Sequence, residues 1–374
     1  MTGPVLVAAA VLTALGDLEQ TWQGLVAGRS GLAPGPLPAP LNRYPVGLVP
    51  GLSGGMGSAL RQENLYRRLL SALPELPPEA GLVLSTTKGA VDELLGGATA
   101  PWPGQPWTLA AEIAGAMGLT GPVATVSGAC ASGTIALIQA AQAVKAKNGP
   151  ACVLVVGIDL LSVFVTGGFA RLQALTPAMC RPFDRHRDGL ALGEGAGALL
   201  VTDADEAKRR GWPILAGIDG WGVSGDAGHI TAPCREASGL KRALALCTAN
   251  GQKRVGAVNA HGTGTKFNDA MEIKAFRESL PPGTPYHSVK GAIGHTLGAA
   301  GVIEAAIAVR SLAAGVIPPS VGLAEEEADG GVTSGKSSLL LCYPSVLSCN
   351  SGFGGINAAV LLAQGESDLA NNIV

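Results

Sequence analysis

The sequence predicts a layered α/β protein. Apolar runs of strand length alternate with longer helical segments, glycines gather at the corners between them, and hydrophobic residues make up 47% of the chain against 14% charged residues. The clearest unit joins a strand that ends near residue 126, an Ala-rich helix over 131–147 and an apolar strand over 151–159. Strand, helix and strand in this order are typical of a parallel pair with a crossover connection.

The same rhythm occurs twice along the 374 residues, which is a length sufficient for two core-forming units. A charged segment over 205–211 ends the first half, and the apolar run 213–224 restarts the pattern. We therefore place one half at 1–207, the other at 212–365 and a loose polar tail at 366–374. The elements expected in the second half are a helix over 238–251, a strand over 254–262, a helix over 269–280, a fully buried small-residue helix over 296–315, and a strand, glycine turn and strand over 347–364.

Charge and cysteine content narrow the classes of function. The formal net charge is -2 with no long basic run, so we expect no nucleic-acid partner. The seven cysteines are odd in number and lack paired spacing, which favours a reducing, cytoplasmic setting. The apolar run 5–16 has no basic flank or cleavage pattern and predicts a first strand. Since no run reaches the roughly 18 to 20 uninterrupted apolar residues of a membrane span, we expect no membrane partner.

Cys130 is the first candidate for chemistry, because it follows a strand and precedes the helix over 131–147. The free N–H groups and partial positive charge of a helix N-terminus favour a thiolate, so we expect a lowered thiol pKa. The same N–H groups stabilise a developing oxyanion. A lone buried cysteine is more often structural, so this interpretation needs further residues.

His261 and His295 supply that support. We expect both at strand-to-helix corners, and each is surrounded by glycines that permit close backbone approach. A single histidine is more often structural than catalytic, but two in equivalent settings favour a shared site. The remaining histidines are interpreted as structural: His186, His229 and His287.

Five motifs in one order carry a resemblance to a known family. They are VSGACASGT at 126–134, RPFDRHRDGLALGEGAGALLV at 181–201, NAHGTGT at 259–265, SVKGAIGHTLGAAG at 288–301 and NSGFGG at 350–355. The sequence resembles the β-ketoacyl-carrier-protein synthases, in particular the elongating type I/II branch, over nearly its whole length. The resemblance implies the thiolase fold, which is a five-layer αβαβα body of two similar βαβαβ-type halves.

The resemblance also implies residue roles. Cys130 is the implied acyl-accepting nucleophile, and the backbone N–H groups of Cys130 and Phe353 are the implied oxyanion hole. The other roles are as follows: His261 and His295 contact the malonyl thioester carbonyl, Lys290 and Glu304 form an ion pair that orders the histidines, and Thr263, Thr265, Phe353 and Gly354 bind substrate.

The implied reaction is a decarboxylative Claisen condensation between an acyl group on Cys130 and a malonyl unit on an acyl carrier protein. It requires no metal or redox cofactor, because decarboxylation creates the carbanion without a base. A homodimer is expected, and a heterodimer with a second synthase-like subunit is possible. The basic residues Arg61, Arg67 and Arg68 are candidates for docking an acidic carrier protein, although a solvated helix face explains them equally well.

The sequence departs from the family pattern at two places. The terminal motif usually reads NSFGFGG, but here NSGFGG is one residue and one aromatic shorter, which alters the loop that closes the acyl pocket. After HGTGT the chain reads KFND at 266–269, where many relatives have a Gly-Asp pair. The sequence therefore does not determine the type of acyl chain, which is an ordinary fatty acid, a polyene or a polyketide.

Three alternatives compete with this prediction. A thiolase needs a second cysteine near the C-terminus, and Cys349 is the candidate, but its surroundings are of the synthase type. A starter-unit synthase of the Cys-His-Asn kind is disfavoured by His295. A non-catalytic chain-length factor lacks the nucleophile, whereas Cys130 is present.

Overall fold

The computed structural model describes residues 3–95, 104–327, 335 and 337–364. The first half forms a five-stranded mixed sheet from β1 (Pro4–Leu12), β4 (Gly81–Ser85), β5 (Val123–Val126), β6 (Cys152–Asp159) and β8 (Gly195–Asp203). The strand order is β5-β4-β6-β8-β1. β4 pairs in parallel with β5 and β6, whereas β8 pairs antiparallel with β6 and β1.

The second half repeats this pairing pattern. Its strands are β9 (Ala216–Gly225), β10 (Ala257–Asn259), β11 (Tyr286–His287), β14 (Ser345–Gly352) and β15 (Ile356–Ala363), in the order β11-β10-β14-β15-β9. β10 pairs in parallel with β11 and β14, and β15 pairs antiparallel with β14 and β9. The prediction of two similar halves is confirmed.

The halves meet where β1 pairs antiparallel with β9, with Leu6 opposite Ala216. Helix α7 (Ala204–Arg210) and a short loop connect β8 to β9. The predicted limits at residues 207 and 212 fall in this connection, and the division into domains stays a prediction. The predicted tail at 366–374 lies outside the described residues.

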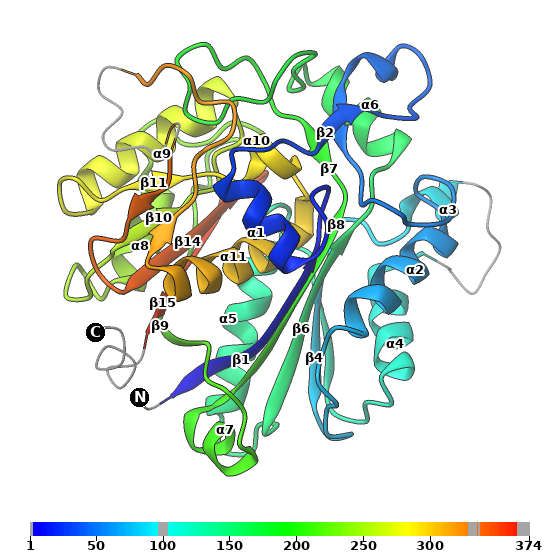
Figure 1. The fold of residues 1–374 in the computed structure, drawn as a ribbon, viewed down its shortest axis with the longest axis vertical. Coiled ribbons are helices and arrows are strands. Elements are labelled where there is room, and N and C mark those ends of the chain that lie inside the picture. The colour runs from blue at the N-terminus through cyan, green and yellow to red at the C-terminus, as the bar shows by residue number, and fades with distance from the viewer. Residues whose placement is uncertain (1–2, 96–103, 328–334, 336, 365–374) are drawn as a thin grey trace.

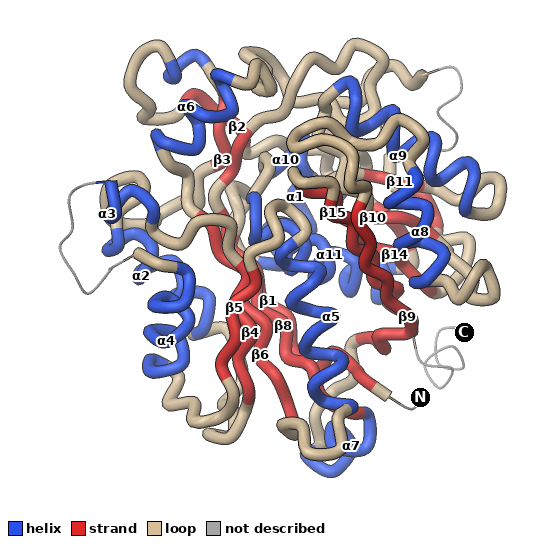
Figure 2. The backbone as a smooth tube through the Cα atoms, turned by 180° about the vertical axis from the view of Figure 1, so that it is seen from behind, coloured by secondary structure: helices blue, strands red, loops and turns tan. Residues whose placement is uncertain are grey.

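Helices and sheets alternate in five layers (Figures 1 and 2). The outer face of the first sheet packs against α2 (Ala59–Leu70) and α4 (Pro106–Ala116), and that of the second sheet against α8 (Ser238–Cys247) and α9 (Lys266–Ser279). The inner faces of both sheets enclose α5 (Ser132–Lys145) and α11 (Ala300–Ala314). The predicted αβαβα architecture is therefore confirmed.

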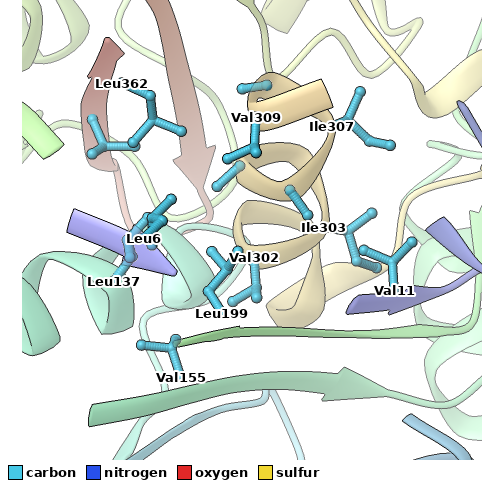
Figure 3. Close-up of a cluster of buried hydrophobic side chains, with 14 of the residues drawn as sticks. Leu6, Val11, Leu137, Val155, Leu199, Val302, Ile303, Ile307, Val309 and Leu362 are labelled. Carbon is cyan, nitrogen blue, oxygen red and sulfur yellow. The ribbon is translucent and has the colours of Figure 1, made fainter. Parts of the chain in front are cut away.

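The central helices approach each other closely at two glycines. A Cβ on Gly133 would lie 2.7 Å from the backbone N of Val302, and a Cβ on Gly301 would lie 2.4 Å from the backbone N of Thr134. Around this crossing, Val302 and Ile303 pack among side chains from α5 and both sheets (Figure 3). Only glycine permits such backbone contact, so the crossing fixes how the N-termini of α5 and α11 face each other.

The stretch Leu297–Ala314 is long and apolar enough to cross a membrane by length and composition, but 83% of it is buried inside the protein. Burial against both sheets explains its composition, because a helix that is apolar on every side packs at the centre of a large core. We therefore assign it as a core helix, as the sequence predicted.

The predicted strands and helices around these layers are confirmed, with shifts at their ends. The helix predicted over 296–315 begins as the 3-10 turn η2 (Leu297–Ala299) before α11, and His295 follows the short helix α10 (Lys290–Ile293), not a strand. The remaining elements are α1 (Leu18–Val26), β2 (Leu32–Pro34), η1 (Leu41–Arg43), β3 (Pro45–Gly47), α3 (Val91–Leu95), α6 (Val163–Arg171), β7 (Leu192–Gly193), β12 (Val316–Ile317) and β13 (Leu339–Leu340).

We predict that Gly133→Ala lowers the free energy of unfolding by about 1–3 kcal/mol, because the new methyl group overpacks the helix crossing. Urea denaturation measures the change. Gly115→Ala is the matched control, since Gly115 lies in α4 with no heavy atom within 4 Å of an added Cβ. The control should be neutral or stabilising. Equal unfolding free energies for Gly133→Ala and wild type would contradict the close crossing.

Candidate active site

Cys130 lies at a sharp corner between β5 and α5. Ala129 has a left-handed φ of +49°, which is uncommon for a residue with a side chain, and α5 begins two residues after Cys130. Cys130 is 7% exposed, and its Sγ lies 3.1 Å from Nε2 of His295. The corner therefore directs a nucleophile of the first half toward the second half.

His295 lies between α10 and η2, where its ring orientation is fixed. Nδ1 accepts a hydrogen bond from the backbone N–H of Leu297 at 3.2 Å, and Leu297 itself has a left-handed φ of +54°. A ring nitrogen that accepts from an N–H carries no proton, so the proton of the neutral imidazole is on Nε2. His295 thus directs an N–H donor at Cys130 Sγ.

His261 follows β10 and lies edge-on to His295, with ring centroids 5.1 Å apart and an interplanar angle of 82°. Its Nδ1 is 3.1 Å from Nδ2 of Asn350, and the same amide nitrogen is 2.7 Å from Oε2 of Glu304. A carboxylate only accepts, so Nδ2 is correctly placed as the donor. His261 therefore also carries its proton on Nε2.

Lys290 of α10 and Glu304 of α11 form a buried ion pair beside the histidines. Lys290 Nζ also donates to the backbone carbonyl of His261. Burial raises the pKa of Glu304, while Lys290 and Asn350 oppose that shift. Lys290 thus holds the backbone of His261, while its partner Glu304 holds Asn350, which donates to Nδ1 of the same histidine. The structure brings together the two residues that the resemblance paired.

Both histidines are neutral near pH 7. Burial, followed by the positive charge of Lys290, holds the pKa of His261 and of His295 well below the usual 6.5. Protonation would place a second cation beside Lys290 in a buried site. The two imidazoles therefore act as neutral hydrogen-bond donors.

The expectation of a lowered thiol pKa is wrong. Burial raises the pKa of Cys130 to about 12, and the opposing effect of Lys290 is smaller. The helix N-terminus was visible in the sequence, whereas removal of the thiol from water was not. In the resting chain Cys130 is therefore a thiol, and the negative charge forms on sulfur only during reaction.

A cavity of about 470 Å³ opens onto these side chains. Cys130, His261 and His295 line it together with Thr263 and Thr265, whose hydroxyl oxygens lie 2.9 Å apart. The two threonines predicted to bind substrate therefore face the same space as the nucleophile. Apolar and polar side chains that converge on one cavity are typical of a ligand site.

The hairpin between β14 and β15 lies against Cys130. A Cβ on Gly352 would lie 3.1 Å from the backbone N of Cys130. Phe353 lines the cavity and stacks on Phe169 of α6, with ring centroids 5.6 Å apart. Within the described residues, the backbone N–H of Phe353 donates to no acceptor, and that of Cys130 contacts only its own thiol. Both N–H groups are therefore available to a substrate oxygen.

Gly354, by contrast, does not line the cavity. Its N–H donates to the carbonyl of Ile230 at 2.6 Å, and its φ is +87°. A glycine in this conformation completes the tight hairpin turn. The structure therefore separates Gly354 from the residues predicted to bind substrate.

Several residues that shape the site were not predicted. Glu272 of α9 accepts from the N–H groups of His261 at 2.8 Å and Gly262 at 2.7 Å, and Asp269 accepts from the N–H of Thr263 at 3.0 Å. Asp269 is the last residue of KFND, so this unusual segment supplies an acceptor for the histidine loop. An acidic residue in the first turn of a helix after a glycine-rich loop was the available signal.

The sulfur and ring nitrogens of Cys130, His261 and His295 lie within 4.8 Å of one another, a spacing that suits a metal ion. A metal-bound imidazole nitrogen must carry no proton. Here both Nδ1 atoms accept from N–H donors, so both Nε2 atoms are protonated. The tautomers favour hydrogen bonding to substrate over metal ligation.

The structure also bears on the thiolase alternative, which the sequence disfavoured, and corrects the docking role considered for Arg61. Cys349 is fully buried on the outer face of the second sheet, in the cluster with α8 and α9, and does not line the cavity. It cannot act as the second cysteine of a thiolase. Arg61 is buried and paired with Glu194, so it is not a docking residue, whereas Arg67 stays exposed beside Glu63.

Comparison with known proteins shows the family. The model of the β-ketoacyl synthase N-terminal domain matches residues 79–207, and that of the C-terminal domain matches residues 215–324. The chain therefore belongs to the β-ketoacyl synthase family.

Curated relatives agree with this assignment. A putative polyketide beta-ketoacyl synthase 1 from Streptomyces cyaneus is 36% identical over 69% of this chain and 64% of its own length. A mitochondrial 3-oxoacyl-[acyl-carrier-protein] synthase from Arabidopsis thaliana is 36% identical over 66% of this chain and 57% of its own length. The matched segments span less than two thirds of these relatives.

Solved structures show the same fold over nearly the whole chain. The ishigamide ketosynthase/chain length factor is 27% identical with a TM-score of 0.86, and covers 97% of this chain and 99% of its own. A beta-ketoacyl synthase from Burkholderia phymatum is 25% identical with a TM-score of 0.84, over 98% of this chain and 100% of its own.

A third histidine, His287, is also buried, and its lowered pKa makes the stability of the fold depend on pH. His287 on β11 has a pKa lowered to about 3 by burial, and neither ring nitrogen has a hydrogen-bond partner among the described residues. Below pH 6.5 the unfolded chain binds a proton here that the native chain does not, so stability falls as the pH falls.

We predict that His287→Leu removes this dependence. Between about pH 6.5 and 5.5, the unfolding free energy of wild type should fall by about 1 kcal/mol more than that of the variant. Urea denaturation at both pH values measures the difference. Parallel pH dependences would show that His287 is protonated in the native state.

Proposed function

We propose that this chain is a β-ketoacyl synthase that joins an acyl group on Cys130 to a malonyl unit through decarboxylative Claisen condensation. The observation that carries the proposal is the 3.1 Å contact between Cys130 Sγ and His295 Nε2, beside a second neutral imidazole in the same cavity. A nucleophile with two fixed N–H donors suits thioester exchange and enolate formation.

In the first half-reaction, Cys130 releases its thiol proton to solvent, and Sγ attacks the carbonyl carbon of an acyl thioester. The backbone N–H groups of Cys130 and Phe353 stabilise the tetrahedral oxyanion, and His295 Nε2–H stabilises the charge on the cysteine sulfur. The bond between the carbonyl carbon and the carrier sulfur then breaks, and the new bond to Cys130 Sγ remains. One thiol replaces another, so the proton lost by Cys130 balances the proton gained by the carrier thiol.

In the second half-reaction, the malonyl thioester carbonyl accepts from the Nε2–H groups of His261 and His295. The bond to the carboxylate breaks, carbon dioxide leaves, and the electron pair forms an enolate that these donors stabilise. The enolate carbon attacks the acyl–Cys130 carbonyl, the S–C bond breaks, and the Cys130 thiolate takes a proton from solvent. This sequence needs no metal, redox cofactor or general base.

The proposed partner is an acyl carrier protein in the cytoplasm, which presents both substrates as phosphopantetheine thioesters. We further propose a dimer, either with a second copy or with a second synthase-like subunit. Strand β5 lies at the edge of its sheet and leaves Val123 45% exposed, which suits strand pairing with a partner. Two proteins of similar fold are described as a ketosynthase with its chain length factor.

The alternative role is a non-catalytic chain-length factor. The convergence of Cys130, His261 and His295 favours the catalytic role, because a subunit without chemistry has no need of two histidines with fixed tautomers. Acyl transfer to the chain separates the two roles.

We predict that acyl-carrier-protein thioesters of different lengths add one acyl mass to the wild-type chain, as detected by intact-protein mass spectrometry. Cys130→Ala should abolish the adduct and keep the fold. Cys342→Ala is the control, because Cys342 is an exposed free cysteine and its loss should leave the adduct unchanged. An adduct that persists in folded Cys130→Ala would refute the nucleophile assignment. No adduct on wild type from any donor would favour the chain-length-factor role.

We predict that His295→Ala or His261→Ala slows decarboxylation of a malonyl carrier protein about 100- to 1,000-fold, because each variant removes one donor to the enolate oxygen. Carbon dioxide release measures the rate. His186→Ala is the control, since the His186 side chain is 58% exposed. A rate equal to wild type in either site variant would remove that histidine from the chemistry.

A further inference from the structure

A buried carboxylate outside the cavity lies behind His295. Asp159 ends β6 in the first half of the chain, and its side chain is fully buried. It accepts hydrogen bonds from five groups, listed with their distances as follows: Thr86 Oγ1 at 2.9 Å, the Thr87 N–H at 2.9 Å, Thr87 Oγ1 at 3.0 Å, Lys88 Nζ at 3.1 Å and the Gly298 N–H at 2.7 Å. Four of the donors come from the loop after β4, and Gly298 comes from the second half.

Gly298 is held in the turn η2 on three sides. Its N–H donates to Asp159, and its carbonyl accepts from Ser85 Oγ at 3.0 Å. A Cβ at this position would lie 2.7 Å from the backbone N of Thr87. The turn therefore fits against the first half with no space for a side chain.

The residue before Gly298 sets the tautomer of His295. Leu297 adopts a left-handed φ of +54°, and its N–H donates to Nδ1 of His295 at 3.2 Å. A leucine in this conformation is strained and persists only when its surroundings fix it. The bonds to Gly298 supply that constraint, because they anchor the next peptide unit.

We propose that Asp159 is a positioning residue that fixes His295 with its proton on Nε2. Asp159 acts through Gly298 and Leu297 and does not line the cavity. When the anchor is lost, the turn relaxes, the Leu297 N–H leaves Nδ1, and the ring can take its proton there. Nε2 then accepts and no longer donates to the thioester carbonyl. The catalytic meaning of this role rests on the proposed function of His295.

The test is long-range ¹⁵N–¹H NMR of histidine-labelled protein, which reports directly which ring nitrogen bears the proton. The chain has five histidines, and a His295→Gln spectrum assigns the His295 signals. Wild type should show Nδ1 without a proton. Asp159→Ala should show a protonated or exchanging Nδ1 of His295. An unprotonated Nδ1 in folded Asp159→Ala overturns the proposal.

Asp184→Ala is the matched control. Asp184 is also fully buried and also accepts from backbone N–H groups, those of His186, Ala324 and Glu325. Its loss should leave the His295 signals unchanged. A change equal to that in Asp159→Ala would mean a general loss of packing and would overturn the specific role.

Gly298→Ala decides the question if Asp159→Ala does not fold. The added methyl group displaces the Gly298 N–H from Asp159 and leaves the carboxylate with its other donors. A protonated Nδ1 of His295 in this variant supports the proposal, and an unchanged Nδ1 overturns it.

Malonyl decarboxylation by the folded variant should fall roughly 10- to 100-fold, as when a catalytic histidine loses its orienting partner. The proposed function and the role of Asp159 are tested by different measurements. A wild-type chain that decarboxylates no malonyl thioester would contradict that function, whereas the tautomer of His295 can still be read with and without Asp159.

Discussion

At the crossing of α5 and α11, Gly133 and Gly301 bring two backbones into contact. The corner with Cys130 precedes the first of these helices, and the turn with His295 precedes the second. Because the two halves of the chain share one buried layer, the crossing determines how a thiol from one half meets two imidazoles from the other. The cavity, the oxyanion donors and the histidine tautomers all depend on this placement.

The electrostatics of the site follow from burial. A charge removed from water is costly unless it is paired, and beside the histidines the cation Lys290 is paired with Glu304. Burial and that cation keep His261 and His295 neutral, whereas burial keeps Cys130 protonated against the smaller opposing effect of Lys290. Before reaction, the two imidazoles and the thiol are therefore uncharged, and the imidazoles present N–H donors. Such a site favours a transition state in which negative charge develops on oxygen.

Much of this arrangement could be predicted from the sequence. Apolar periodicity and glycine corners gave the layers and the repeated halves, and the motifs placed Cys130, His261, His295, Lys290 and Glu304 in one site. Two of the expectations that failed concern burial: the thiol pKa and the accessibility of Arg61. The third, Gly354, failed because its N–H is paired with the carbonyl of Ile230 outside the cavity. A local pattern shows which residue begins a helix, but it does not show how much water reaches the side chain.

The supporting residues were harder to predict because their contacts are remote in the sequence. Asn350 lies 89 positions from His261, and Asp159 lies 139 positions from Gly298. Asp159 ends the apolar strand β6 and Asn350 lies within β14, and the role of each depends on which strand becomes its neighbour. Only the sheet order and the helix crossing reveal that these side chains orient the two histidines.

The most direct measurement is the rate of carbon dioxide release from a malonyl carrier protein between about pH 6.5 and 8.5. Because burial keeps the pKa of both histidines well below 6.5, neutral donors should give a rate that does not change across this range. Glu272 titrates in this range, since burial raises its pKa to about 8. A rate that rises or falls with an apparent pKa inside the range in both wild type and Glu272→Gln would therefore show that a histidine titrates during the reaction. That result would contradict decarboxylation driven by two neutral imidazoles.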